Sequence, residues 1–170
     1  MMELSLLQII ILSIIQAVTE FLPISSSAHL LLPSKVLGWP DQGIIFDITV
    51  HFATLMAVLI YFRDEFLKLS FYFSKTFLFL VISTLPIVFI VLFVEGIGDY
   101  RWSLTSIAYA NIFFALLLYV SEKTSQQKYS NSDMTAKHAI VIGLFQIFSL
   151  ISGASRSGTA ITGSLFLGYR

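Results

Sequence analysis

Three long apolar runs constrain what this chain can fold into more than any other feature of its sequence. They lie near residues 44–62, 76–94 and 103–120, and each approaches the roughly twenty residues that a helix needs to cross a bilayer. Helices are the expected spanning form because lipid offers no partners to open strands, and the alternating segments typical of an outer-membrane barrel do not occur. With 56% apolar and 12% charged residues, the chain is predicted to be an all-α polytopic membrane protein.

Composition also excludes several classes of function. The sequence has no cysteine, which excludes disulfides, thiolate catalysis and cysteine-based metal sites. Its ten basic and ten acidic residues give a formal net charge of zero, so no nucleic-acid partner is expected. The first apolar run has no basic region before it and no small-residue cleavage pattern after it. We therefore expect it to belong to the mature fold rather than to a signal peptide.

Two further apolar segments, residues 4–15 and 139–151, are too short to span a bilayer. Each runs into a polar stretch, Gln-Ala-Val-Thr-Glu-Phe-Leu-Pro-Ile-Ser-Ser-Ser-Ala-His at 16–29 and Ser-Gly-Ala-Ser-Arg-Ser-Gly-Thr at 152–159. Proline breaks a helix and serine can satisfy the freed backbone groups, so each segment is expected to enter the membrane and turn back as a re-entrant helical hairpin. Ionisable groups at membrane depth are costly and indicate a functional site.

The sequence predicts a single membrane domain over residues 1–170. A charged connector at 63–75 joins the first two spans, and a short loop at 95–102 joins the second and third. The expected parts are the first re-entrant unit with its outer loop at 1–43, three spans within 44–120, a polar, flexible cytoplasmic loop at 121–137 and a second, truncated re-entrant unit at 138–170.

An internal repeat relates the two hairpins. Three spans separate them, and an odd number means that they enter from opposite faces, which predicts an inverted-topology repeat whose broken helices meet near the bilayer midplane. A shift of 130 residues aligns Gln16 with Gln146, Thr19 with Ser149, Pro23 with Gly153, Ser25 with Ser155 and Ser27 with Ser157.

Basic residues orient this arrangement. The connectors at 63–75 and 121–137 fall on one side and carry three Lys or Arg each, whereas the other side offers only Lys35 and Arg101. The positive-inside tendency places the two connectors in the cytoplasm. The first hairpin is then expected to enter from the outer face.

Facing hairpins would bring together the chemistry of phosphoryl transfer. Arg156 presents a planar fork of donors suited to phosphate oxygens, and at the bilayer centre an arginine costs roughly 2.5–3.5 kcal/mol unless it has an anionic partner. Gly153 and Gly158 would let the backbone approach that partner. The groups expected to confront each other are Glu20, Ser25, Ser26, Ser27 and His29 on one side and Ser155, Arg156, Ser157 and Thr159 on the other.

Individual residues within this set have alternative interpretations. Glu20 and Gln16 share a helix face and could bind a divalent cation, Mg²⁺ or Ca²⁺, with substrate phosphates completing the shell. Glu20 and Arg156 could instead form a buried ion pair that pins the hairpins. The serines could serve only to satisfy broken backbone, and His29 could be a packing group.

Three polar residues within the predicted spans have their own interpretations. Asp47 and His51 are four apart on one helix face, where Asp47 could lie at the interface with His51 against a packed neighbour, or both could line the polar cavity. Asn111 is the single amide side chain of its span and is expected to make a hydrogen bond between helices.

The two polar stretches resemble the signature regions of the bacterial undecaprenyl-diphosphate phosphatases, the bacitracin-resistance family. The first motif of that family runs Glu/Gln-x-x-x-Glu-Phe-Leu-Pro-x-Ser-Ser-x-x-His, and the second runs Pro-Gly-x-Ser-Arg-Ser-Gly-x-Thr. Residues 46–58 also resemble the family's second segment. Ala28 replaces the glycine that usually precedes the motif histidine, and Ser152 replaces the motif proline. Ala160 stands at the position of the motif threonine, with Thr159 one place early, and Gln16 is the less common choice at its position.

The resemblance implies hydrolysis of undecaprenyl diphosphate to the monophosphate and inorganic phosphate in the bacterial inner membrane, which recycles the lipid carrier for peptidoglycan and confers bacitracin resistance. It implies Glu20 as principal carboxylate with Gln16 as its partner, Ser26 and His29 as candidates for nucleophile or acid–base group, and Arg156 as diphosphate clamp. The implied phosphate-binding residues are Ser25, Ser27, Ser155, Arg156, Ser157, Gly158 and Thr159.

Family members continue for several helices beyond the second motif, whereas this sequence stops about ten residues after it. We therefore expect a fragment or a shortened protein. Besides hydrolysis, the same arrangement could serve a prenyl-phosphate transporter or flippase, or a chain that is inactive until a partner supplies further helices. A homo-oligomer is also compatible with the pattern.

Overall fold

The structure is a computed structural model that describes residues 4–94 and 103–170, and within them it is helical apart from one isolated bridge pair. The loop predicted at 95–102, including Arg101, lies outside the described residues. The helices are α1 (Leu6–Thr19), α2 (Ser26–Val36), α3 (Gly43–Tyr61), α4 (Arg63–Phe66), α5 (Leu69–Tyr72), α6 (Lys75–Phe93), α7 (Leu104–Thr124), α8 (Ala136–Ile147) and α9 (Arg156–Leu167), with 3-10 turns η2 (Asn131–Asp133) and η3 (Phe148–Leu150).

The three predicted spans are confirmed as helices. In the described chain, α3, α6 and α7 are the helices long and apolar enough to cross a membrane. Most of their side chains face outward, because no more than 11% of any apolar window is buried. Such exposure suits contact with lipid, and the chain is accordingly a multi-pass membrane protein. The third helix continues four residues beyond the predicted span, to Thr124.

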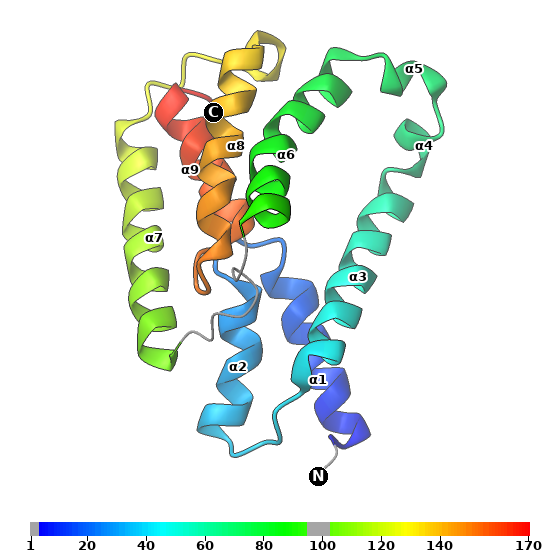
Figure 1. Cartoon of the computed structure of the whole chain (residues 1–170), viewed down its shortest axis with the longest axis vertical. Coiled ribbons are helices and arrows are strands. Elements are labelled where there is room, and N and C mark those ends of the chain that lie inside the picture. Colours follow the sequence, from blue (N-terminus) through cyan, green and yellow to red (C-terminus); the bar gives the residue numbers. More distant parts are fainter. Residues whose placement is uncertain (1–3, 95–102) are drawn as a thin grey trace.

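The two short apolar segments form helical hairpins in the same register. Helix α1 begins at Leu6 and α8 at Ala136, while α2 begins at Ser26 and α9 at Arg156, so both pairs of starts are separated by the 130 residues of the sequence repeat. In Figure 1 the α1–α2 hairpin occupies the lower end and the α8–α9 hairpin the upper end, and their turns meet between them. Insertion of the hairpins from opposite faces of a bilayer stays a prediction.

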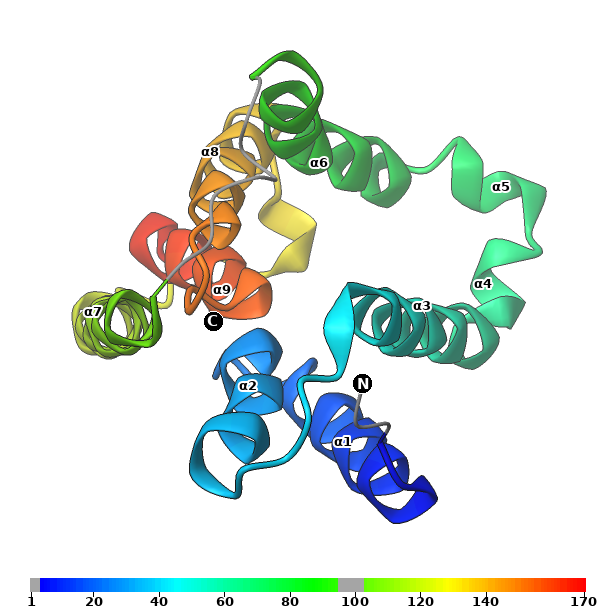
Figure 2. The ribbon, with the colours of Figure 1, turned by 60° about the horizontal axis from the view of Figure 1, so that its bottom comes forward.

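Close helix contacts hold the second hairpin in place. Helix α8 packs against α6, and α9 against α7 and α8 (Figure 2). A Cβ added to Gly143 of α8 would lie 2.6 Å from the Ser83 carbonyl oxygen of α6, and one added to Gly163 would lie 2.9 Å from the Phe145 ring. Helices in membranes associate through such small residues because they let the backbones approach.

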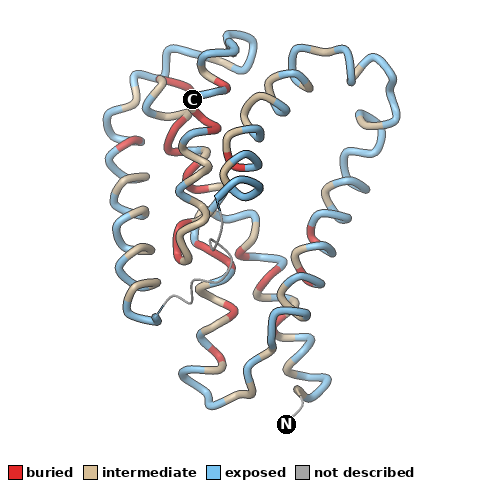
Figure 3. The backbone as a smooth tube through the Cα atoms, viewed as in Figure 1, coloured by how far each residue is buried: buried red, intermediate tan, exposed pale blue. Residues whose placement is uncertain are grey.

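Buried positions gather in the hairpins and their turns (Figure 3). The first hairpin and α3 share a small core in which Leu12, Leu30 and Val50 are nearly inaccessible. In the described chain, α3 packs mainly against α1 and against α4, the short helix that follows it. The molecule thus consists of an α1–α2–α3 group and an α6–α9 group that meet at the hairpin turns.

Both predicted cytoplasmic connectors lie at the same end of the molecule (Figure 1). The polar loop at 121–137 was expected to be flexible, and this interpretation needs correction: its first residues extend α7, its last begin α8, and its middle is paired with the C-terminal residues. The Tyr129 amide donates to the Gly168 carbonyl (3.0 Å), and the Arg170 amide donates to the Tyr129 carbonyl (3.3 Å). Polar composition alone could not reveal a partner forty residues away.

The side chain of Tyr169 stabilises this pairing. Its side chain is buried, and its hydroxyl lies 2.6 Å from His138 Nδ1. Burial, with the charge of Asp133 and the neighbouring Tyr129 as smaller causes, raises the pKa of Tyr169 above its ordinary 10.0. Because the pKa of Tyr169 is higher in the folded protein than in the unfolded chain, the contribution of the neutral Tyr169 hydroxyl to folding stability is fully present below pH 10. That contribution is lost as pH rises through the folded-state pKa.

We expect Tyr169→Phe to weaken the Tyr129–Tyr169 pairing by about 0.5–1.5 kcal/mol, the net contribution of one hydrogen bond. Hydrogen exchange at the Tyr129 and Arg170 amides near neutral pH would rise accordingly. In thermal unfolding from pH 9 upward, the stability of the parent should fall toward that of the variant as Tyr169 ionises. A stability difference that stays constant through this range would contradict the assignment.

Candidate active site

The first hairpin turn is built around an unusual backbone conformation. Helix α1 ends at Thr19, Pro23 lies in the turn, and α2 begins at Ser26. Between them Ser25 adopts φ 63° and ψ 97°, a left-handed region that favours glycine. Such a residue costs about 1–3 kcal/mol, and strain of this kind clusters at functional sites. The turn therefore holds its polar side chains in a fixed, strained geometry.

Glu20 is the centre of this turn. Its Oε2 accepts a hydrogen bond of 2.6 Å from Ser26 Oγ and one of 3.1 Å from Gln16 Nε2. The His51 Nε2 atom of α3 lies 3.4 Å from the same oxygen, within ion-pair distance. Gln16 and Glu20 thus share a helix face as predicted. The serine hydroxyl that points at the carboxylate is that of Ser26.

The second hairpin turn repeats part of this arrangement. Ser155 caps α9 by accepting the Gly158 amide at 3.2 Å, and its hydroxyl lies 3.0 Å from that of Ser157. The first turn has the equivalent contact between Ser25 and Ser27, at 3.2 Å. Both pairs match under the 130-residue shift.

Two hydrogen bonds join the turns to each other and to α7. Ser157 Oγ donates to the Leu22 carbonyl at 3.2 Å, which links the second turn to the first. Asn111 Nδ2 donates to the Ile24 carbonyl at 3.4 Å, so the hydrogen bond predicted between helices is made instead to the broken backbone of the first turn. These bonds satisfy carbonyl groups that the broken helix leaves free.

A small polar cavity of about 100 Å³ lies where the turns meet. Both α2 and α9 begin at its wall, and the positive ends of two helix dipoles favour an anion there. Arg156 adds a full positive charge. The lining residues are Glu20, Ser25, Ser26, Ser27, His51, Ser149, Ala154, Ser155 and Arg156.

A larger groove of about 690 Å³ adjoins this cavity along α3. The two spaces share Glu20, Ser27, His51 and Arg156. Away from these residues the groove wall is largely apolar. An amphiphilic ligand would find a polar cavity for its head beside an apolar groove for its tail. The remaining lining residues are Phe21, Asp47, Ile48, Phe52, Thr54, Leu55 and Val58.

The structure does not bring every predicted residue to the cavity. His29 Nδ1 donates to the Ser25 carbonyl at 2.8 Å, and the ring lines a separate apolar groove between α1 and α2. Thr159 is buried, and its hydroxyl donates to the Arg156 carbonyl at 3.0 Å. Ser157 serves the contact between turns. None of these three side chains, His29, Ser157 and Thr159, lines the polar cavity.

The two turn glycines differ from expectation in what they approach. A Cβ on Gly153, which has φ 101°, would lie 2.5 Å from the Ile107 carbonyl oxygen of α7. A Cβ on Gly158 would lie 3.4 Å from the Pro23 Cβ atom. Gly153 therefore permits close packing against α7, whereas Gly158 is only in ordinary van der Waals contact with Pro23.

His51 and Ser149 are the polar cavity residues that sequence reasoning did not select. For His51 the structure favours the cavity over packing, and its Nδ1–H donates to the Asp47 carbonyl at 2.7 Å, which aims Nε2 at Glu20. The spacing of Asp47 and His51 was the available signal. For Ser149 the signal was its alignment with Thr19 in the repeat, and its buried hydroxyl has no partner in the described part of the chain.

The ion-pair alternative for Arg156 is not realised within residues 4–94 and 103–170. The basic partner of Glu20 there is His51, and no pair joins Glu20 to Arg156. The guanidinium consequently remains able to bind an anion in the cavity.

The donors for a divalent cation are few but suitable. The described residues hold no cluster of three or more His, Cys, Asp or Glu. The three close contacts of Glu20 described above all reach Oε2, and Gln16 Oε1 is fully buried without a partner in the described chain. Gln16 turns its amide nitrogen toward Glu20 and does not line the cavity, so the oxygen donors suited to Mg²⁺ or Ca²⁺ there are the Glu20 carboxylate and substrate phosphates.

Fold and site together define an all-helical, multi-pass membrane protein with an arginine-bearing polar cavity between two broken hairpins. Comparison with known proteins specifies this class further. The profile of the family "Bacitracin resistance protein BacA" matches residues 9–170, and the chain belongs to this family.

Several relatives carry the name undecaprenyl-diphosphatase. That of Alteromonas mediterranea is 43% identical over 179 residues, covering 98% of this chain and 67% of the relative. That of Campylobacter concisus is 44% identical over 181 residues, covering 99% and 67%. The relative from Pseudoalteromonas translucida, named undecaprenyl-diphosphatase 1, is 42% identical with 96% and 66% coverage. The chain thus spans about two thirds of the length of these relatives.

Proposed function

We propose that this protein hydrolyses undecaprenyl diphosphate to undecaprenyl phosphate and inorganic phosphate. The observation that carries the proposal is the 2.6 Å hydrogen bond from Ser26 Oγ to Glu20, in a cavity whose wall includes Arg156. A hydroxyl held on a carboxylate beside a bound phosphate is the arrangement that nucleophilic phosphoryl transfer requires. The names of the relatives support the same substrate.

In the first step Ser26 Oγ attacks the terminal phosphorus. Glu20 takes the hydroxyl proton, the bond from phosphorus to the bridging oxygen breaks, and undecaprenyl phosphate leaves with the proton that Glu20 returns to it. Arg156 and the N-termini of α2 and α9 stabilise the charge on the phosphoryl oxygens. His51 and Gln16 hold the carboxylate in position.

In the second step water hydrolyses the phosphoserine. Glu20, ionised again, takes a proton from the attacking water, the bond between Ser26 Oγ and phosphorus breaks, and Glu20 passes the proton to Ser26 Oγ. Inorganic phosphate is the product. His29 is assigned no proton transfer here, since its ring lines the separate groove between α1 and α2.

The substrate's two ends would occupy the two adjoining spaces. The diphosphate fits the small polar cavity, and the prenyl chain fits the apolar groove along α3. Burial of the prenyl chain supplies affinity, at about 0.8 kcal/mol for each buried methylene.

A divalent cation, Mg²⁺ or Ca²⁺, belongs to the proposal as well. The Glu20 carboxylate would hold it, with phosphate oxygens completing the shell. When bound, the cation would neutralise charge on the diphosphate.

Location completes the proposal. The basic connectors favour a cytoplasmic location for residues 63–75 and 121–137 in a bacterial cell, and the first hairpin would then enter the inner membrane from the periplasmic face. With the cavity opening to that face, the enzyme would regenerate the carrier lipid of peptidoglycan synthesis and so support cell-wall growth and bacitracin resistance.

Phosphate release from detergent-solubilised undecaprenyl diphosphate tests the proposal, with Mg²⁺ or Ca²⁺ added to chelated samples. We expect release by the parent and at least about a 100-fold lower rate for Glu20→Gln, the loss typical of a removed general base. Glu122→Gln, at the end of α7, is the matched control and should keep the parent rate. Binding or translocation of the lipid without phosphate release would favour a transporter or flippase and reject hydrolysis.

A further inference from the structure

The connector between α3 and α6, residues 62–74, exposes large apolar side chains. Leu67 is 81% exposed, Leu69 74% and Phe73 85%. Several of these lie close in sequence, which distinguishes them from the scattered apolar residues of an ordinary surface. Contiguous apolar surface of this kind marks contact with a partner or a membrane.

The connector is ordered rather than loose. Phe66 and Phe71 pack edge to face with ring centroids 5.4 Å apart, and Phe71 continues the contact to Tyr72 and to Phe77 of α6. Lys68 pairs with Glu65 at 3.0 Å. The charged residues thus gather in α4 and at Lys68, while α5 carries mainly apolar and aromatic side chains.

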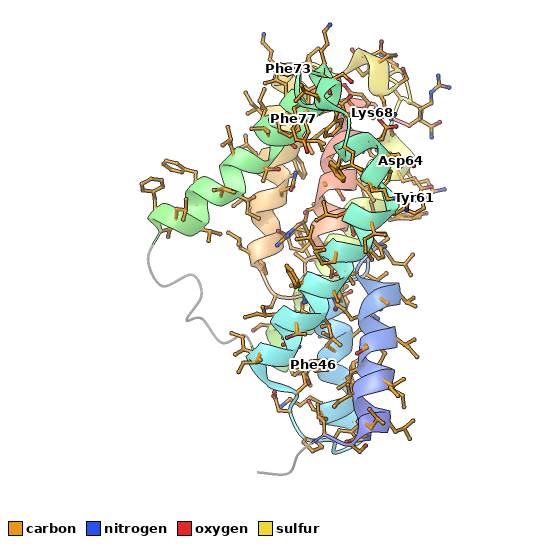
Figure 4. The ribbon with its side chains drawn as sticks, turned by 90° about the vertical axis from the view of Figure 1, so that its right-hand side faces the viewer. Phe46, Tyr61, Asp64, Lys68, Phe73 and Phe77 are labelled. Carbon is orange, nitrogen blue, oxygen red and sulfur yellow. The ribbon has the colours of Figure 1, made fainter. Side chains whose placement is uncertain are left out.

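The flanking helices fix where this segment lies. Helices α3 and α6 each have 19 residues, a length of about 28 Å, which matches a hydrocarbon core of about 30 Å. Tyr61 ends α3 and Lys75 begins α6, so both lie at span ends on the side of the molecule that carries the connectors (Figure 1). In Figure 4, Tyr61, Asp64, Lys68 and Phe73 follow one another from the end of α3 toward the upper end of the molecule.

We propose that residues 62–74 form an interfacial strap that lies along the surface of the bilayer, with Leu67, Leu69 and Phe73 inserted at the boundary between headgroups and acyl chains. The partner is the lipid surface itself. Aromatic and amphipathic segments bind there because their apolar parts leave water while their charged groups stay hydrated. This inference concerns membrane contact and does not depend on the proposed hydrolysis.

The strap has a consequence for α3. In the described chain the larger contacts of α3 with the long helices are made to α1, whereas α6 packs on α8. Anchoring the strap in the interface therefore fixes the end of α3 beside the groove that adjoins the cavity.

Spin labelling measures the proposed depth directly. The chain has no cysteine, so Leu67→Cys and Phe73→Cys each give one labelled site in the whole protein. The labelled protein is reconstituted in vesicles of phosphatidylethanolamine and phosphatidylglycerol. Collision with oxygen, which partitions into lipid, is compared with collision with a water-soluble nickel chelate. We expect an oxygen-to-nickel accessibility ratio at least about fivefold higher at both positions than at a labelled Ser132→Cys in the 3-10 turn at the same end.

Two results would overturn the proposal. A ratio at positions 67 and 73 equal to that at 132 would place the connector in water. Labels shielded from both reagents would indicate a protein partner instead of lipid. The two labelled positions are independent, so a folding defect in one variant, detected by circular dichroism, leaves the other to decide.

Discussion

Ser26→Ala is expected to lower the rate of phosphate release by at least about 1,000-fold. This is the scale of loss expected when the nucleophile is removed from a set of catalytic residues that act together. The hydroxyl removed is the one that donates to Glu20 at 2.6 Å. The substrate's KM should change little because the phosphate is held by other groups. Initial rates from a phosphate-release assay over a range of lipid concentrations provide the measurement.

Neighbouring serines supply matched controls for this substitution. Ser27→Ala also removes a cavity hydroxyl, but one bonded to Ser25 instead of Glu20, and should cost at most about tenfold, the effect of a single neutral hydrogen bond. Ser34→Ala, farther along α2 with its hydroxyl on the Leu31 carbonyl, should keep the parent rate. If Ser26→Ala retained more than a tenth of the parent rate, Glu20 would have to activate water directly.

Arg156→Lys is expected to lower kcat/KM by about 10- to 100-fold although it conserves charge. The guanidinium is a planar fork that can hold two phosphate oxygens at once, and an ammonium group is a point charge that cannot. Arg156→Ala removes charge and fork together and should cost about 100- to 1,000-fold, as for the loss of a preorganised donor to a transition-state oxyanion.

Lys123→Ala is the appropriate charge control. Lys123 lies near the end of α7 over the Tyr119 ring, away from the cavity lining. Its removal lowers net charge as much as Arg156→Ala does and should leave kcat/KM unchanged. Equal rates for Arg156→Lys and the parent would show that only charge, and not the fork, is used.

Much of this architecture could be predicted from sequence because the bilayer imposes strong length rules. Segments near twenty apolar residues became α3, α6 and α7, and the two shorter ones became hairpins that break at their polar stretches. The cavity followed from the repeat, which brought Glu20 and Arg156 to the same turn region. These features depend on local pattern and on counting spans.

Other features depend on three-dimensional placement that local pattern does not encode. His29 falls on the face of α2 that looks into the α1–α2 groove, so a motif position does not reveal its neighbours. His51 reaches Glu20 because α3 packs against α1. The ordered 121–137 loop depends on Tyr169, a partner far along the chain.

The common register of the hairpins has a consequence for how the chemistry is divided. Ser26 and Arg156 are the first residues of α2 and α9 and occupy the same position in the two repeats. One structural frame, used twice in opposite halves of the molecule, thus presents an electron-pair donor from one side and an electron-poor clamp from the other. Under the proposed mechanism the two repeats differ in chemistry at this position and also at Glu20, which aligns with Leu150.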